Sequence, residues 1–120
     1  DVRNTVTRQA GALFGQYDAL LTPSMPDLPW PLGRYGEKEE QLDGLGWTAR
    51  LFDHSPYTPL ANVAGLPAMS VPLAQSADGL PIGMQFMAAY ADDGTLLRLA
   101  GQLERAAPWQ HRRPPVWAGN

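Results

Sequence analysis

The apolar residues at the start of the chain recur at helical spacing. They are Val2, Val6, Ala10, Leu13 and Phe14, and together they form one stripe on a helix over residues 2–14. Gly15 stands where such a helix is expected to end. The next apolar run, YDALLTP, is short and closes at Pro23, so it predicts a buried strand.

From residue 23 the pattern changes to that of a loop. Prolines are dense over residues 23–31, and the charged run EKEEQ follows; neither suits a strand or a long helix. We therefore predict a long proline-rich loop over residues 23–50. Four apolar residues favour a loop that packs against other parts of the protein, and a surface excursion is the alternative. These residues are Met25, Leu28, Trp30 and Leu32.

A short helix is expected after this loop. Ser55 can cap a helix start and Pro56 suits its first position, because proline loses no intrahelical hydrogen bond there. The helix would run to about Ala64 and end at Gly65, where a left-handed cap meets no Cβ clash. Pro67 prevents the helix from resuming.

Two strands and a further helix complete the pattern. AMSVPLA is a strand with Pro72 at an edge or bulge, QSADG is a turn, and residues 82–89 alternate as a strand covered on both faces. Asp92 or Asp93 can cap a final helix that Pro108 ends, and Trp109 is expected to pack beside it. The predicted buried stripe of that helix is Leu96, Leu99, Ala100, Leu103 and Ala107. Helices alternating with buried strands predict an α/β fold.

Composition excludes several classes of partner. The net charge is −3 with both signs scattered, so neither nucleic acid nor an anionic membrane is expected to bind. No apolar run is long enough to span a bilayer, and there is no cysteine for a disulfide or a thiolate metal site. We expect a soluble, cytoplasmic protein without a cofactor. The basic residues His111, Arg112 and Arg113 are predicted to form a solvated tail.

The side chains that could carry chemistry do not form a self-contained active site. His54 adjoins Ser55, but neighbouring residues rarely aim at each other and no GxSxG elbow surrounds any serine. Asp53 and His54 give at most two metal ligands, so no metal site is predicted. Asp92 and Asp93 are explained by capping, and the glutamates of EKEEQ by a solvated surface.

Several linked motifs resemble the carboxy-terminal part of amidase signature family enzymes. They are YDALLTPSMP, SPYTPLANVAGLPAMSVPLAQSADGLPIGMQF, DDGTLLRLAGQLERAAPW and RRPP, in that order. The segment SPYTPLANVAGLPAMSVPL is most similar to the bacterial branch that includes nylon cyclic-dimer hydrolases. The resemblance implies part of a mixed-sheet α/β fold with flanking helices, and hydrolysis of carboxylic amides through a Ser, cis-Ser, Lys triad.

This chain departs from the family pattern at the triad itself. Its single lysine, Lys38, lies inside an acidic run, and no glycine-serine-rich stretch is present. We assign no catalytic residue here. Residues 1–120 are expected to be a carboxy-terminal fragment of a single larger amidase domain, with the triad upstream of Asp1 and no activity of the fragment alone. The alternative is a non-catalytic binding or assembly module that retained part of the fold.

The resemblance also implies that this region shapes the substrate pocket. The segment from Pro23 to Tyr57 is the candidate wall, with Trp30, Trp47, Ser55 and Tyr57 as possible substrate-binding residues. At Ser55 the glutamyl-tRNA amidotransferase branch places an aspartate, so serine there counts against that branch. The expected partners are a small-molecule amide, the remainder of the amidase chain and a possible second copy in a homo-oligomer.

Overall fold

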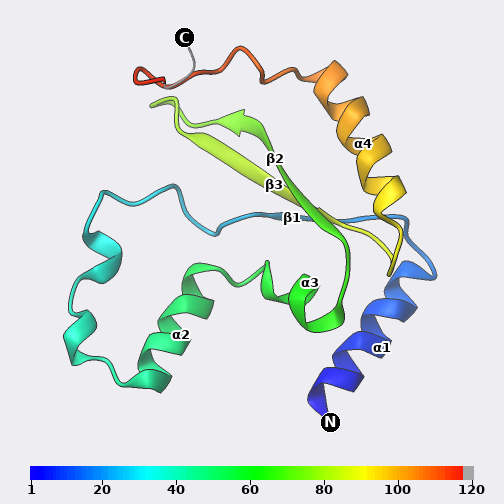
Figure 1. Ribbon diagram of the computed structural model, residues 1–120, viewed down its shortest axis with the longest axis horizontal. Coiled ribbons are helices and arrows are strands. Elements are labelled where there is room, and N and C mark those ends of the chain that lie inside the picture. Colours follow the sequence, from blue (N-terminus) through cyan, green and yellow to red (C-terminus); the bar gives the residue numbers. More distant parts are fainter. Residues whose placement is uncertain (118–120) are drawn as a thin grey trace.

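The computed structural model describes residues 1–117 as helices around a small sheet (Figure 1). The N-terminal helix is followed by the first strand of the sheet, the loop region comes between that strand and the other two, and a last helix covers one face of the sheet. The elements are α1 (Val2–Phe14), β1 (Leu20–Pro23), the 3-10 helices η1 (Arg34–Gly36) and η2 (Glu39–Gln41), α2 (Gly44–His54), α3 (Pro59–Ala64), β2 (Ala68–Gln75), β3 (Pro81–Met87) and α4 (Asp93–Ala106).

The sheet has the order β1-β3-β2, and both pairings are antiparallel. β3 is central, and Gln85 stands opposite Thr22 of β1 and Ser70 of β2. The α/β class expected from the sequence is confirmed. Strands β2 and β3 are joined by the predicted turn, where Gly79 takes a left-handed φ of 80°.

The core lies between the sheet and α4. Val71, Phe86, Ala88 and Leu96 are buried together, and α4 adds Leu99 and Leu103 to this cluster. Because side chains alternate along a strand, Phe86 points toward α4 while Gln85 points to the opposite face. Packing on the predicted stripe of α4 is therefore confirmed. Trp109 packs against the same cluster, as expected.

The strand predicted to be buried, β1, is an edge strand with one exposed face. Leu21 is 52% exposed, whereas Leu20 and Thr22 are half-buried. The prediction of a buried strand was wrong because apolar letters alone do not reveal a strand's place in the sheet. Within the described residues, nothing covers the Leu21 side as fully as α4 covers the middle of the sheet.

The predicted loop over residues 23–50 is too long, because helix α2 begins at Gly44. The carboxylate of Asp43 accepts a hydrogen bond of 2.7 Å from the backbone N–H of Gly46 and so caps the helix. Two glycines in its first turn have low helix propensity, so the sequence did not indicate a helix here. The aspartate before them was the signal that could have revealed it.

The helix start predicted at Ser55 and Pro56 was also wrong. Ser55 follows α2 as its C-terminal cap, and its hydroxyl donates to the carbonyl of Leu51 at 3.0 Å. Helix α3 begins three residues later, with Thr58 as cap and Pro59 at the first position. The expected end at Gly65 is confirmed by its left-handed φ of 69°.

A β-bulge, one of the alternatives expected at Pro72, is present in β2. The C-terminal segment is hydrogen-bonded to it. The register of β2 against β3 shifts between Val71 and Ala74, which leaves carbonyls without strand partners. The guanidinium of Arg112 donates to the carbonyls of Pro72 at 2.7 Å and Leu73 at 3.3 Å. Arg112 is therefore not part of a solvated tail, contrary to the prediction.

Asp92 is the N-terminal cap of α4. This confirms one of the two predicted alternatives, which were Asp92 and Asp93. Its carboxylate accepts hydrogen bonds from the backbone N–H of Thr95 at 3.2 Å and from the Thr95 hydroxyl at 2.6 Å. The hydroxyl bond is the main reason that the pKa of Asp92 lies below its ordinary value, and Arg98 adds a smaller effect in the same direction.

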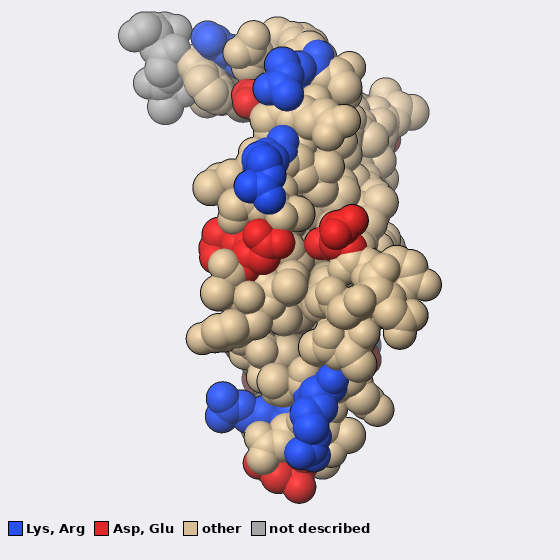
Figure 2. Space-filling view, turned by 90° about the vertical axis from the view of Figure 1, so that its right-hand side faces the viewer, with Lys and Arg blue, Asp and Glu red and all other residues tan. Residues whose placement is uncertain are grey.

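The face that carries α1 and α4 is mostly uncharged, with basic groups toward its two ends and acidic groups near its middle and at its lower end (Figure 2). Several large apolar side chains are well exposed in the chain, among them Val2 at 80%, Tyr90 at 78% and Leu97 at 73%. Helix α1 also packs against α3, where the buried residues are all alanines. Of the helices formed within residues 1–117, none is long and apolar enough to cross a membrane.

Candidate functional site

The most distinctive part of the molecule is the segment that leaves the sheet after β1. We call residues 24–54 the excursion; it contains η1, η2 and α2 and lies to one side of the sheet in Figure 1. Its first residue is fixed to the sheet, because the N–H of Ser24 donates to the carbonyl of Gly83 at 2.9 Å. Just beyond its end, the carbonyl of Tyr57 accepts from the side chain of Gln85 at 3.4 Å.

Four rings hold the excursion together. We call Trp30, Tyr35, Trp47 and His54 the aromatic cluster. The His54 ring lies 4.6 Å from Trp30 and 5.0 Å from Tyr35 between ring centroids, both tilted. Trp47 meets Tyr35 edge-on at 6.2 Å. These spacings are those of stabilising aromatic pairs, so residues from the proline-rich stretch, η1 and α2 pack as one unit.

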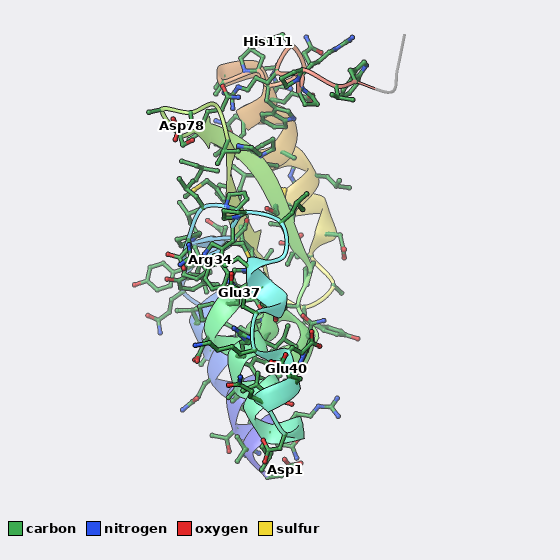
Figure 3. All side chains as sticks on the ribbon, turned by 90° about the vertical axis from the view of Figure 1, so that its left-hand side faces the viewer. Asp1, Arg34, Glu37, Glu40, Asp78 and His111 are labelled. Carbon is green, nitrogen blue, oxygen red and sulfur yellow. The ribbon has the colours of Figure 1, made fainter. Side chains whose placement is uncertain are left out.

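Polar groups enclose the cluster from outside. The Trp47 indole N–H donates to the Glu39 carboxylate at 2.8 Å, and Arg50 donates to the carbonyl of Glu37 at 2.8 Å. The same Arg50 guanidinium lies 5.9 Å from the Tyr35 ring, and that of Arg34 lies 5.1 Å from the Trp30 ring. Arg34 and Glu37 are seen at the surface of the excursion in Figure 3.

A cleft of about 670 Å³ opens between the excursion and the sheet. Residues 25–33 line one side and residues 81–83, at the start of β3, line the other, while Tyr35 and His54 complete the wall. The lining is mainly prolines and large apolar side chains, and Asp27 is its one carboxylate among the described residues. A cleft of this size and character suits a small, largely apolar ligand.

Two polar atoms of the aromatic cluster have no hydrogen-bond partner among the described residues. They are the Tyr35 hydroxyl and Nδ1 of His54, and both atoms are buried. A buried polar atom without a partner costs stability, so such atoms are rare in folded proteins and require a reason. Here both occur on side chains that line the same cleft.

A second group of polar side chains crosses the sheet face opposite to α4. Gln85 is 5% exposed, and its amide donates to the Thr22 hydroxyl at 3.3 Å. Next to it the hydroxyls of Ser24 and Ser70 are hydrogen-bonded to each other above Gly83. A Cβ on Gly83 would lie 2.7 Å from the Ser24 oxygen, so only glycine leaves room for this pair.

The four predicted binding residues occupy different places. Trp30 lines the cleft, and Trp47 stands behind it in the aromatic cluster. Ser55 caps α2 and Tyr57 contributes its backbone carbonyl, and neither is part of the cleft wall. A role in binding for these four side chains stays a prediction.

Sequence reasoning missed the residues that stand out most in the structure. The sequence brings His54 to notice only beside its chain neighbours Asp53 and Ser55, and it gives no prominence to Tyr35 or Gln85. Gln85 could have been found as a lone amide within an apolar strand. Nothing in the sequence reveals that Tyr35 and His54 meet, because their contact depends on α2 folding back on η1.

The single lysine of the sequence lies away from the cleft. Lys38 is exposed and takes a left-handed φ of 60° at the start of η2, outside the cleft wall. Within residues 1–117, no three His, Asp or Glu side chains gather closely enough to hold a metal ion.

Comparison with known families gives one match over most of the chain. Residues 1–97 match the family described as Amidase. The protein named "Putative amidase AmiC" from Mycobacterium leprae (strain TN) is 45% identical over 105 residues, which are 85% of this chain and 21% of that protein. The chain thus spans about a fifth of the length of the curated relatives it matches.

Solved structures show the same relationship. The structure of 6-aminohexanoate cyclic dimer hydrolase complexed with substrate matches with a TM-score of 0.78 and 34% identity, over 94% of this chain and 23% of that one. The native peptide amidase from Stenotrophomonas maltophilia matches with a TM-score of 0.62 and 28% identity, over 97% of this chain and 21% of that one.

Proposed function

Because the chain belongs to the amidase family, we propose that it is the carboxy-terminal portion of an enzyme that hydrolyses carboxylic amides, and that residues 23–57 form part of its substrate pocket. The observation that carries this proposal is the cleft of about 670 Å³ between the excursion and β3. The likeness of the chain to 6-aminohexanoate cyclic dimer hydrolase, solved in complex with its substrate, supports the same assignment.

The catalytic groups are proposed to lie outside these 120 residues. In a Ser, cis-Ser, Lys mechanism the serine attacks the amide carbonyl and forms an acyl-enzyme, while the second serine and a neutral lysine carry the proton to the leaving amine. Such a lysine requires a buried site that disfavours its charge. Lys38 is exposed, which argues against that role. This chain then supplies scaffold and pocket wall rather than the reacting atoms.

The pocket wall favours a neutral amide with a large apolar body. Trp30, Leu28 and Ile82 offer apolar contact area, and Asp27 is the sole charged side chain in the described lining. Burying a charged substrate group against such a wall without a partner would be costly.

The remainder of the amidase chain is the partner proposed to cover the exposed apolar side chains. Val2, Leu45 and Leu97 are each more than 70% exposed in this chain. Large apolar side chains in such number mark surfaces that pack against another structure. A second copy in a homo-oligomer would be an additional partner for the same kind of surface.

The experiment combines the intact mass of the denatured protein with activity. A mass far above that of 120 residues identifies a longer polypeptide, which is expected to hydrolyse amides and to be labelled once by a serine-directed phosphonate at a serine outside residues 1–120. A longer polypeptide that neither hydrolyses amides nor takes the label would refute the proposal. A 120-residue protein that never associates with a chain bearing the triad would support the alternative of a binding or assembly module.

A further inference from the structure

The two unpartnered atoms of the aromatic cluster have a function in substrate choice. We propose that the Tyr35 hydroxyl and Nδ1 of His54 form a polar anchor, which hydrogen-bonds a neutral polar group of the substrate that lies away from the amide bond being cut. This inference rests on the proposed function and names the substrate class: an apolar amide that carries one remote group able to donate and accept a hydrogen bond.

Burial of these two polar atoms without partners lowers the stability of the folded protein. A hydroxyl or ring nitrogen that loses water on burial and gains no partner destabilises the folded protein. Phenylalanine at position 35 would preserve the ring contacts with Trp30, Trp47 and His54 without this cost. Local rules are broken in this way mainly at functional sites, where the loss of stability is compensated by a gain in binding.

The two atoms lie at the wall of the cleft, beneath its surface. Both side chains belong to the cleft wall, yet both atoms are buried. A ligand reaches them when a ring of the cluster turns. Such a movement is inexpensive in this segment, because η1 and η2 have no buried residue and neither packs on the sheet as α4 does.

The chemistry of the pair fixes the ligand class. The tyrosine hydroxyl both donates and accepts, and Nδ1 of a neutral imidazole does one or the other according to its tautomer. Together they match a hydroxyl on the ligand, which both donates and accepts a hydrogen bond. An ionised group fits poorly, because the surrounding rings cannot replace its water. The neighbouring guanidinium groups of Arg34 and Arg50 already lie against Trp30 and Tyr35.

The test uses the full-length enzyme and two pairs of amides that differ by one hydroxyl. Benzamide and 4-hydroxybenzamide probe the acyl side, and acetanilide and 4-hydroxyacetanilide probe the amine side. In one of the pairs the wild type is expected to favour the hydroxylated amide in kcat/KM. Tyr35→Phe should reduce that preference, taken as the ratio of kcat/KM for the hydroxylated amide to kcat/KM for the plain amide, about tenfold, the factor that one hydrogen bond commonly supplies.

Stability provides a readout that separates the anchor from a structural role. Tyr35→Phe removes an unpaired buried oxygen and no protein hydrogen bond, so its melting temperature should equal or exceed that of the wild type. His54→Phe should reduce the same preference with the ring stack preserved. Tyr17→Phe, at a side chain 60% exposed, is the matched control and should leave both preference and stability unchanged.

The outcomes distinguish the anchor from the proposed function. An unchanged preference in both pairs for a folded Tyr35→Phe enzyme would overturn the anchor while amide hydrolysis stands. If the wild type hydrolyses none of the four amides, binding is followed through Trp30, which lines the cleft, by quenching of tryptophan fluorescence. Tighter binding of a hydroxylated amide that Tyr35→Phe abolishes supports the anchor, and equal binding by both proteins overturns it.

Discussion

The sheet with α4 and the excursion are held together by different kinds of contact. Between the sheet and α4, Val71, Phe86 and Ala88 are at most 7% exposed, and the packed side chains are apolar. In the excursion no residue is fully buried, and the contacts are tilted rings, guanidinium groups over rings, and two polar atoms without partners.

This difference shows where the molecule gains stability and where it retains adaptability. A dry apolar core tolerates little change, because any lost volume leaves a cavity. A half-exposed cluster of rings can shift with less cost, since its contacts are few and partly solvated. The cleft lies at the border between the two regions, so one wall is expected to be rigid and the other adjustable.

The largest effect is expected from Phe86→Ala in the core. Removing the buried ring should lower the free energy of unfolding of the full-length protein by about 3–5 kcal/mol, through lost burial and a residual cavity. Urea unfolding followed by circular dichroism measures this change. Phe52→Ala in α2, at a side chain 50% exposed, is the matched control and should cost far less. Equal losses at the two positions would contradict the comparison.

A smaller and local effect is expected from Trp30→Ala in the excursion. Without this ring His54 and Arg34 lose their aromatic neighbour, so the excursion should open more often while the core stays intact. Hydrogen exchange of amides in residues 31–54 should quicken about tenfold, and exchange in β3 should not change. A rise in exchange that extended equally into β3 would show that the two regions unfold as one.

The smallest effect concerns the cap of α4 and its dependence on pH. The pKa of Asp92 is lowered in the folded protein, so its carboxylate stabilises the fold above the unfolded-state pKa, and this contribution fades as the pH falls through the folded-state pKa. The melting temperature of the wild type should exceed that of Asp92→Ala at neutral pH, and the gap should narrow in acid. A gap that stays constant across this range would rule out the assigned cause.

Much of the fold could be predicted from the sequence, because its signals are local. The spacing of Val2 to Phe14 and the aspartate before α4 define helices without reference to the rest of the chain. Pro72 in β2 indicated an edge, a bulge or the end of a strand, and β2 is an edge strand with a bulge. Helix α2 was missed because Gly44 and Gly46 argue against a helix, and tertiary packing of Trp47 and His54 overrides that preference.

The candidate site could be predicted only in outline. The proline-rich stretch indicated a wall, and Trp30 does line the cleft. The pairing of Tyr35 with His54 joins residues from two separate elements, and no local pattern encodes which rings meet. Arg112 and the carbonyl of Pro72 to which it donates are 40 positions apart in the sequence, so the basic tail alone did not indicate this hydrogen bond.

The hydrogen bonds from Arg112 to β2 affect the order in which the protein can fold during synthesis. A ribosome completes β2 and its bulge well before Arg112 leaves the exit tunnel, so the carbonyls of Pro72 and Leu73 at first find only water. The edge of β2 therefore lacks these hydrogen bonds until Arg112 has emerged. A chain that lacked Arg112 would leave this edge open to pairing with another molecule.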